Sequence, residues 1–131
     1  CYFQKIKNGG DITLDDGTVI ANEKLSSDPL PPKSYAFCSD TVYHEAVIPI
    51  IENVDVLYHE STFLQSEESL ALKTLHSTAK EAATIALKAN AKQLVLGHYS
   101  TRYESIELFK EEAETVFPNV LLADDGRSFE F

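Results

Sequence analysis

Residues 75–103 read LHSTAKEAATIALKANAKQLVLGHYSTRY, and this stretch decides the fold class of the chain. The segment Thr78–Glu81 fits a capping box, in which the threonine hydroxyl and the glutamate carboxylate satisfy backbone N–H groups, so a helix is predicted over Thr78–Asn90. A stripe of small apolar residues on this helix can approach a sheet closely: Ala79, Ala82, Ala83, Ala86 and Leu87. The apolar run Gln93–Gly97 then predicts a buried strand.

On both sides of this stretch, short apolar runs alternate with helical segments from residue 35 onward. Strands are predicted at Tyr35–Cys38, Val54–Tyr58 and Gln93–Gly97, and helices near Tyr43–Ile51, Thr78–Asn90 and Glu104–Phe117. This alternation indicates an α/β domain with a mixed or parallel sheet. Val120–Ala123 and Ser128–Phe131, which flank an Asp-Asp-Gly turn, are predicted to form a closing strand pair.

Residues 1–34 form a region of different character, rich in glycine and proline turn signals. Apolar residues alternate on both sides of the Asp-Asp-Gly sequence within Ile12–Ile20, which predicts a hairpin followed by a Pro-rich connector. The predicted division is therefore 1–34 and 35–131. The chain begins without an initiator Met and without an apolar signal region, so we expect it to be a fragment of a longer protein.

Composition limits the classes of function. The formal net charge of -10 argues against a general nucleic-acid-binding surface, because neutralising phosphates requires clustered Lys and Arg. No apolar run approaches the roughly 20 residues of a membrane span, so no membrane association is expected. Cys1 and Cys38 form no metal-binding spacing and no disulfide framework, so both are predicted to be free thiols in a reducing, cytoplasmic setting.

Polar residues follow the predicted strands at three places. Asp40 comes after the first strand, His59 and Glu60 after the second, and His98 after the third, while His76 precedes the helix start. In α/β sheets, ligands and catalytic groups gather beyond the carboxyl ends of the strands, so these residues are predicted to share one site.

Each of these residues also has a purely structural interpretation. Asp40 fits a helix N-cap, His98 a hydrogen-bonded loop residue, and His76 the flank of a capped helix. His59 with Glu60 fits a surface pair. The coincidence of three histidines at strand or helix junctions favours the functional interpretation, and His44, on a predicted helix, is assigned no role.

The residue types suit metal-assisted hydrolysis. A carboxylate such as Asp40 can bridge two divalent cations, imidazole completes the ligand shell, and such a pair lowers the pKa of bound water to about 7. A histidine outside the shell, such as His76, can protonate a leaving oxygen if a carboxylate such as Glu60 orients it.

Four motifs in order resemble those of the ribonuclease Z family, the transfer-RNA 3' processing endonucleases of the metallo-β-lactamase superfamily. They are Ser39-Asp40-Thr41, His59-Glu60-Ser61-Thr62 before Phe63, His76-Ser77-Thr78, and the H-x-S-x-R-Y ending His98–Tyr103. The resemblance implies the C-terminal half of an αββα metallo-β-lactamase fold, with a mixed sheet flanked by helices. The superfamily's first metal motif, H-x-H-x-D-H, is absent, so its ligands, like the family's substrate arm, are expected upstream of Cys1.

The resemblance also implies residue roles. Asp40 is similar to the bridging aspartate and His98 to the last metal-binding histidine of a site for two zinc ions, with manganese as an alternative. His76 is similar to the proton-donating histidine, Glu60 to its orienting partner, and His59 is a supporting candidate. Three residues are candidates for substrate contacts: Arg102, Ser100 and, less directly, Lys33.

The implied substrate is precursor transfer RNA, cut by a full-length homodimeric parent in the cytoplasm. The isolated chain is expected to be inactive, because Asp40 and His98 alone cannot hold two bridged ions. Two alternatives remain at this point. One is another hydrolase of this fold, acting on a small phosphodiester or sulfate ester, and the other is a non-catalytic interaction module that has kept the fold.

Overall fold

A computed structural model describes residues 2–130, which divide into two compact units, one up to Pro32 and one from Lys33 onward. Cys38 is a free thiol, as predicted. Cys1, to which the same prediction applies, lies outside the described residues, as does Phe131.

The first unit contains the predicted hairpin. Its elements are α1 (Tyr2–Lys7), β1 (Ile12–Thr13), β2 (Val19–Ile20) and the 3-10 helix η1 (Asn22–Lys24). The two strands pair antiparallel with Ile12 opposite Ile20, and Gly17 in the turn has a φ of 83°, a backbone conformation that glycine adopts without steric cost. The Asn22 side chain donates to the carbonyl of Ile6 and its backbone N–H donates to Asp11, so η1 is tied to both neighbouring segments.

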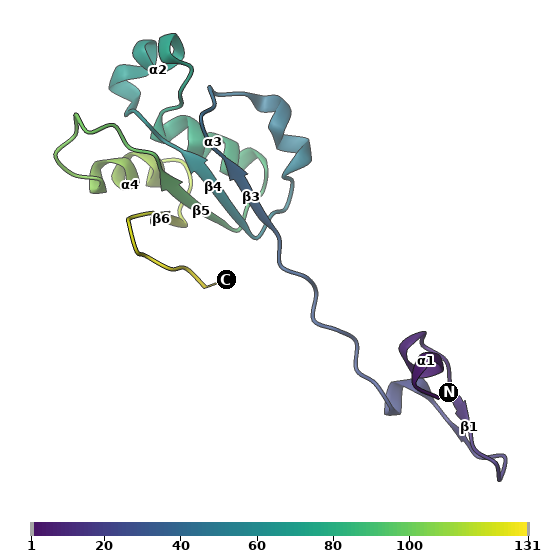
Figure 1. The fold of residues 1–131 in the computed structure, drawn as a ribbon. Helices are drawn as coiled ribbons and strands as arrows, with labels where there is room; N and C mark the ends of the chain where they lie inside the picture. Colours follow the sequence, from purple (N-terminus) through teal and green to yellow (C-terminus); the bar gives the residue numbers. More distant parts are fainter. Residues whose placement is uncertain (1, 131) are drawn as a thin grey trace. The chain divides into compact units, whose positions relative to one another are not determined.

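The second unit is built on a four-stranded sheet. Its strands are β3 (Tyr35–Cys38), β4 (Val56–Glu60), β5 (Gln93–Gly97) and β6 (Val120–Leu122), in the order β3-β4-β5-β6. All three pairings are parallel, so a mixed sheet is not formed among the described residues. Crossover connections join each strand to the next, so that all run in the same direction. In Figure 1 the arrows of β3, β4 and β5 point toward the end where α2 lies.

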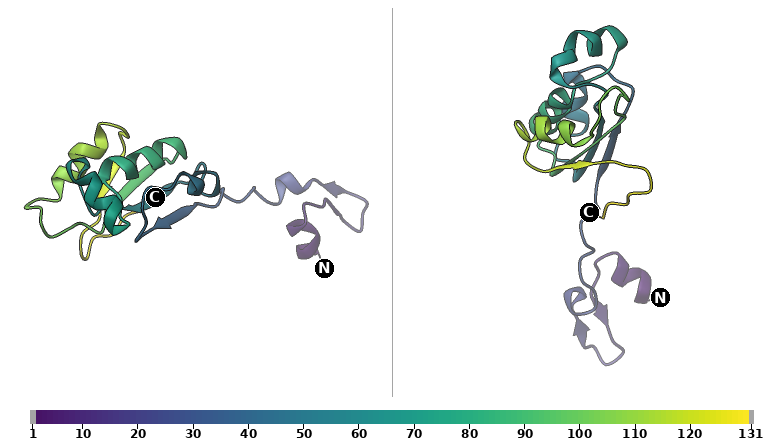
Figure 2. Two further views of the ribbon diagram at one scale, coloured as in Figure 1. Left: turned by 90° about the horizontal axis from the view of Figure 1, so that it is seen from above. Right: turned by 90° about the vertical axis from the view of Figure 1, so that its left-hand side faces the viewer.

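Helices fill these crossovers. They are η2 (Glu45–Ile50), η3 (Gln65–Glu67), α2 (Glu68–Thr74), α3 (Ala79–Lys88) and α4 (Glu107–Glu114). Helices α3 and α4 lie on the same face of the sheet (Figure 2). The core lies between them and the strands and includes side chains with no exposed surface: Leu57, Ile85, Leu94, Leu96 and Phe109.

The predicted capping box is present at the start of α3. The Thr78 hydroxyl accepts from the Glu81 N–H, and the Glu81 carboxylate accepts from the Thr78 N–H. The predicted alanines of the stripe are fully buried, but Leu87 is 54% exposed and Ile85 is buried instead. The helix face that packs against the sheet therefore includes Ile85 and not Leu87.

Two predicted elements differ in form. The helix near Tyr43–Ile51 is the 3-10 helix η2, which contains Pro49 and has no side-chain cap. The second strand runs from Val56 to Glu60 rather than from Val54 to Tyr58, so His59 and Glu60 lie inside it. A strand is possible there because both polar side chains have hydrogen-bond partners.

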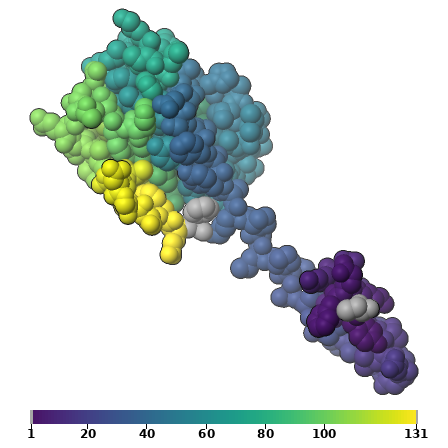
Figure 3. Space-filling model, viewed as in Figure 1, coloured from purple at the N-terminus to yellow at the C-terminus, as the bar shows by residue number. Residues whose placement is uncertain are grey.

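The closing strand pair is also not formed as predicted. Val120–Leu122 is strand β6, but residues 123–130 make no strand. Phe129 instead lines an apolar cavity of about 320 Å³ with Tyr35, Phe37 and Tyr58, on the sheet face that α3 and α4 leave open. Figure 3 shows this C-terminal segment, in yellow, on the surface of the second unit beside residues drawn in green. None of the described helices is long and apolar enough to cross a membrane.

Candidate metal centre

The carboxyl ends of β3 and β5 present two candidate ligands on unusual backbone. Asp40 follows β3 with a φ of 49°, and His98 follows β5 with a φ of 62°. Non-glycine residues seldom adopt this left-handed conformation, and where they do so they are enriched at functional sites. The two side chains meet, because Nε2 of His98 lies 3.3 Å from Oδ1 of Asp40.

His76 reaches the same place from the segment that precedes α3. One ligand atom each from Asp40, His76 and His98 lies within 4.8 Å of the others, and the two imidazole rings are 5.2 Å apart between centroids. The exposed fraction of the side chain is 74% for Asp40, 43% for His98 and 24% for His76. The structure thus brings three predicted site residues together, and each of their side chains is at least partly exposed to solvent.

Glu60 lies beneath this cluster and is completely buried. Its Oε1 accepts from the Thr41 N–H at 3.0 Å and from Nδ1 of His76 at 2.7 Å. Its Oε2 accepts from the N–H and the hydroxyl of Thr62, at 3.1 and 2.7 Å. Burial alone raises the pKa of Glu60, but the hydrogen bonds from Thr62 and His76 outweigh it and lower the pKa overall, so the carboxylate is ionised at neutral pH.

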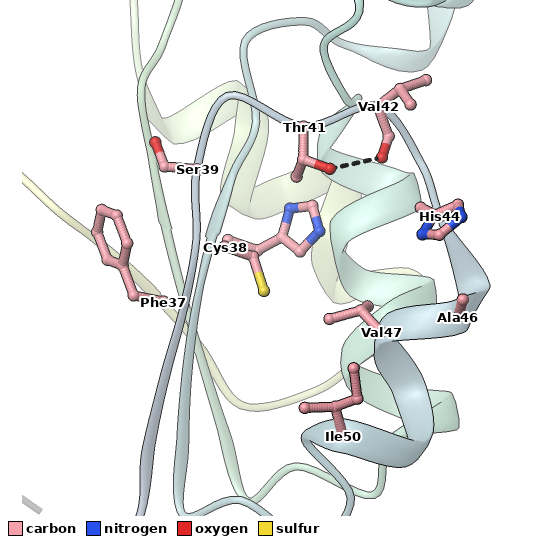
Figure 4. A pocket seen from close by; sticks show the side chains of 10 residues that line it. Phe37, Cys38, Ser39, Thr41, Val42, His44, Ala46, Val47 and Ile50 are labelled. Atoms are coloured by element: carbon pink, nitrogen blue, oxygen red, sulfur yellow. Dashed lines mark hydrogen bonds between the residues drawn. The ribbon is translucent and has the colours of Figure 1, made fainter.

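His59 lies on the other side of β4 from Glu60, because successive strand residues face opposite ways. It is 1% exposed, and its Nδ1 donates to the Glu60 carbonyl at 2.8 Å. Burial lowers the pKa of His59, which favours the neutral ring. Its side chain lines a cavity of about 360 Å³ with Cys38 and His44, shown in Figure 4, and is not part of the Asp40 cluster. His44, which had no predicted role, precedes η2 instead of lying in a helix.

Two of the three predicted substrate-contact residues lie close to the cluster. The Ser100 N–H donates to the Thr62 carbonyl, and Nε of Arg102 donates to the Ser100 hydroxyl at 3.2 Å. The Arg102 guanidinium also lies 5.1 Å from the centre of the Phe63 ring. Nη1 of Arg102 also lies 3.9 Å from Oε2 of Glu67, so the half-exposed guanidinium is held by contacts on several sides.

Lys33 is not brought to this site. It precedes β3, whereas Asp40 follows β3, so the strand separates the two residues. Lys33 lines a shallow cavity with Asp55 and Lys92, which form a salt bridge with 2.6 Å between Nζ and Oδ1. The structure therefore does not support Lys33 as a residue of the site.

The donor set fits a divalent transition metal ion. Zinc ligands bind at about 2.0–2.2 Å, so two ligands of one ion lie at most roughly 4.4 Å apart. The 3.3 Å between Asp40 and His98 meets this limit. Among residues 2–130, only Asp40, His76 and His98 place three ligand atoms within 4.8 Å of one another. Three ligands are too few for the two ions expected from the motifs.

Sequence reasoning missed the residues that hold the cluster together. Thr62 links Glu60 to Nδ1 of His98, and the Ser77 hydroxyl donates to the Thr41 carbonyl at 2.6 Å. The Tyr103 hydroxyl accepts from the Leu64 N–H at 3.0 Å. Thr62, Ser77 and Tyr103 all lie within the four motifs. Their sequence position near the candidate ligands was therefore the signal that could have identified them.

Comparisons with known proteins show what the chain is similar to. The chain is 50% identical to ribonuclease Z of Parabacteroides distasonis over 124 residues, covering 95% of this chain and 41% of that protein. It is 48% identical over 129 residues to ribonuclease Z of Anoxybacillus flavithermus, covering 97% of this chain and 41% of the relative. The chain thus spans about two fifths of the length of these curated relatives. No family model matches it.

Two solved structures have a similar fold. The metallo-beta-lactamase fold protein YhfI from Bacillus subtilis aligns with a TM-score of 0.70 and 29% identity, over 75% of this chain and 40% of that one. A long form RNase Z from yeast aligns with a TM-score of 0.61 and 28% identity, over 70% of this chain and 12% of that one. The α/β metallo-β-lactamase fold class and the resemblance that the four motifs indicated are both confirmed.

Proposed function

We propose that this chain, which resembles one segment of ribonuclease Z over 95% of its length, is part of a metal-dependent endoribonuclease that removes 3' trailers from precursor transfer RNA. One observation carries the proposal. Asp40, His76 and His98 present ligand atoms within 4.8 Å of one another at the carboxyl end of the sheet. The activity belongs to the full-length protein, because the chain spans 41% of this relative's length.

Asp40 and His98 are the residues that would hold metal. A bound divalent ion lowers the pKa of water and stabilises negative charge on a phosphoryl oxygen. Carboxylate and imidazole suit zinc first and manganese as an alternative. We expect two ions in the complete site, with the remaining ligands in an H-x-H-x-D-H motif upstream of Cys1, so the isolated chain is expected to be inactive.

His76 acts as the proton donor in this proposal. Its Nδ1 is bonded to Glu60, so its Nε2 is the nitrogen available to the reacting group. There it protonates the leaving 3' oxygen of the transfer RNA, while the trailer keeps a 5'-phosphate. The ionised Glu60 carboxylate accepts from Nδ1 and so fixes the orientation of the ring.

Arg102 and Ser100 bind the phosphate backbone next to the cut. The guanidinium offers a planar fork that matches two phosphate oxygens. Ser100 and Phe63 contact the guanidinium and hold it in place. Because the net charge of this chain is -10, we expect most other phosphate contacts to come from outside it. A cytoplasmic homodimer is the expected form of the full-length protein.

A second candidate is another phosphodiesterase or sulfatase of the same fold, since the likeness to YhfI carries the fold without a stated substrate. A non-catalytic interaction module is the third. The experiment compares precursor transfer RNA with a chromogenic phosphodiester as substrates of the full-length protein, for wild type and Asp40→Asn. The proposal expects one cut after the transfer-RNA body, lost in Asp40→Asn. Cleavage of the small diester alone supports the second candidate, and no cleavage of either supports the third.

A further inference from the structure

The Thr62 hydroxyl lies between the candidate metal ligand His98 and the buried carboxylate of Glu60. Thr62 Oγ1 is 2.8 Å from Nδ1 of His98 and 2.7 Å from Oε2 of Glu60. The side chain is almost enclosed, with 8% of the residue exposed. Its backbone is fixed as well, because its N–H donates to Glu60 and its carbonyl accepts from the Ser100 N–H.

Counting hydrogens assigns the direction of these two bonds. An ionised carboxylate has no proton to donate, so Glu60 accepts and the single hydroxyl hydrogen of Thr62 points toward it. The Thr62 oxygen then has only lone pairs left for His98, so Nδ1 of His98 carries the proton and donates. The other nitrogen, Nε2, points toward the cluster and lies 3.3 Å from Oδ1 of Asp40.

His76 has the same relation to Glu60 without an intermediary, since its Nδ1 donates directly to the other carboxylate oxygen. The buried Glu60 carboxylate therefore orients both imidazole rings so that Nε2 of each ring points toward the cluster. The Thr62 hydroxyl is the hydrogen-bond partner of Nδ1 of His98 among the described side chains, so its removal would leave this tautomer without a contact that favours it.

We infer that Thr62 is a positioning residue that fixes the tautomer and orientation of His98 by relaying its Nδ1 hydrogen bond to Glu60. Glu60 thereby orients the metal-binding histidine as well as the proton-donating one. This inference rests on the proposed function for the roles of the two histidines, but the tautomer and the zinc affinity that it concerns are measurable without RNA.

The experiment uses the full-length protein with Thr62→Val, which keeps the side-chain shape and removes the hydroxyl, and Thr62→Ser, which keeps the hydroxyl. Thr84→Val is the matched control, because the Thr84 hydroxyl bonds only to a carbonyl within α3. Zinc affinity is measured by competition with a chelator. Loss of a hydrogen bond that orients a metal ligand typically costs about 10- to 100-fold in affinity, which is the expected loss in Thr62→Val. Thr62→Ser and Thr84→Val are expected to stay within a few-fold of wild type.

The second readout is the histidine tautomer in metal-free protein, from nitrogen-15 NMR of the imidazole rings. Wild type and Thr62→Ser are expected to show the Nδ1-protonated form of His98, and Thr62→Val a mixture. An Nε2-protonated His98 in wild type overturns the inference even if Thr62→Val does not fold, and so does wild-type zinc affinity in a folded Thr62→Val. If zinc affinity falls as expected but wild type does not cut precursor transfer RNA, the proposed function fails and the positioning role stands.

Discussion

Nδ1 of His76 donates to Oε1 of Glu60 over 2.7 Å, which joins the segment before α3 to the end of β4. His98 is instead tied to Thr62 and lies beside Asp40. The two histidines face one cluster but are held by different contacts. Holding metal and donating a proton should therefore be separable by substitution.

His76→Ala in the full-length protein is expected to keep metal and lose activity. A positioned proton donor contributes roughly 10²- to 10⁴-fold to rate, so kcat should fall by that range while zinc content is unchanged. His98→Ala is expected to lose both, because it removes a ligand. The measurements are zinc per protomer by elemental analysis and cleavage of precursor transfer RNA. His44→Ala, outside the cluster, is the control. Equal zinc loss in both variants would make His76 a ligand.

His59 makes the free energy of unfolding depend on pH. Burial lowers its pKa in the folded state, so the folded protein keeps the ring neutral while the unfolded chain binds a proton below about pH 6.5. The stability contribution is therefore complete above pH 6.5 and is lost progressively as the pH falls toward the folded-state pKa.

His59→Asn tests this, because the Asn amide can donate to the Glu60 carbonyl in place of Nδ1 but does not titrate. Urea unfolding at pH 7.5, 6.5 and 5.5 should show a smaller loss of stability on acidification in the variant than in wild type. Parallel pH profiles for the two proteins would show that His59 is not the group responsible.

The sequence predicted the elements with a local signal. The capping residues at Thr78 and Glu81 and the apolar run of β5 are such signals, and both elements formed where expected. Polarity misled at the end of β4, because His59 and Glu60 look like loop residues as long as the groups that bond to them, the Glu60 carbonyl and the His76 ring, are unknown. The left-handed backbone at Asp40 and His98 has no comparable sequence signal, since it depends on how the strand exits are held.

Lys33 was the weakest of the site predictions for a reason that strand geometry makes plain. Extended chain rises by about 3.3 Å per residue, so Lys33 and Asp40, at opposite ends of β3, are separated by roughly 20 Å. Proximity in the sequence was a poor guide to proximity at the site. The motif residues were predicted better, because parallel strands bring their carboxyl ends to one edge.

Gly97 has no room for a side chain, because a Cβ there would lie 2.7 Å from Cε2 of Tyr58 and would also meet the Tyr58 hydroxyl. The Tyr58 ring stacks on Phe37 with 4.6 Å between centroids, so moving Tyr58 away disturbs this contact. Gly97→Ala is expected to lower the free energy of unfolding by about 1–3 kcal/mol, as overpacking does. In a Tyr58→Ala background the same change should cost much less, which a double-mutant cycle by urea unfolding measures. Equal costs in both backgrounds would place the strain elsewhere.

Arg102 provides the most direct test of substrate binding by this chain. Its guanidinium lies over Phe63 and its Nε donates to Ser100, so a phosphate that binds it meets a charge already held in place. A charge-assisted hydrogen bond contributes about 1.5–3 kcal/mol, so Arg102→Ala should lower kcat/KM for precursor transfer RNA by roughly 10- to 100-fold. Zinc content should not change, because Arg102 is no ligand.

Arg102→Lys separates charge from shape in the same assay. It keeps the positive charge but has neither the planar fork nor the Nε that donates to Ser100, so it is expected to recover only part of the loss. Arg127→Ala is the matched control, since Arg127 donates to the Leu122 carbonyl and lies over Phe129, away from the cluster. The dependence of KM on salt should become shallower in Arg102→Ala and stay unchanged in the control. Equal effects of the two alanine variants would mean that overall charge, and not a contact at Arg102, governs binding.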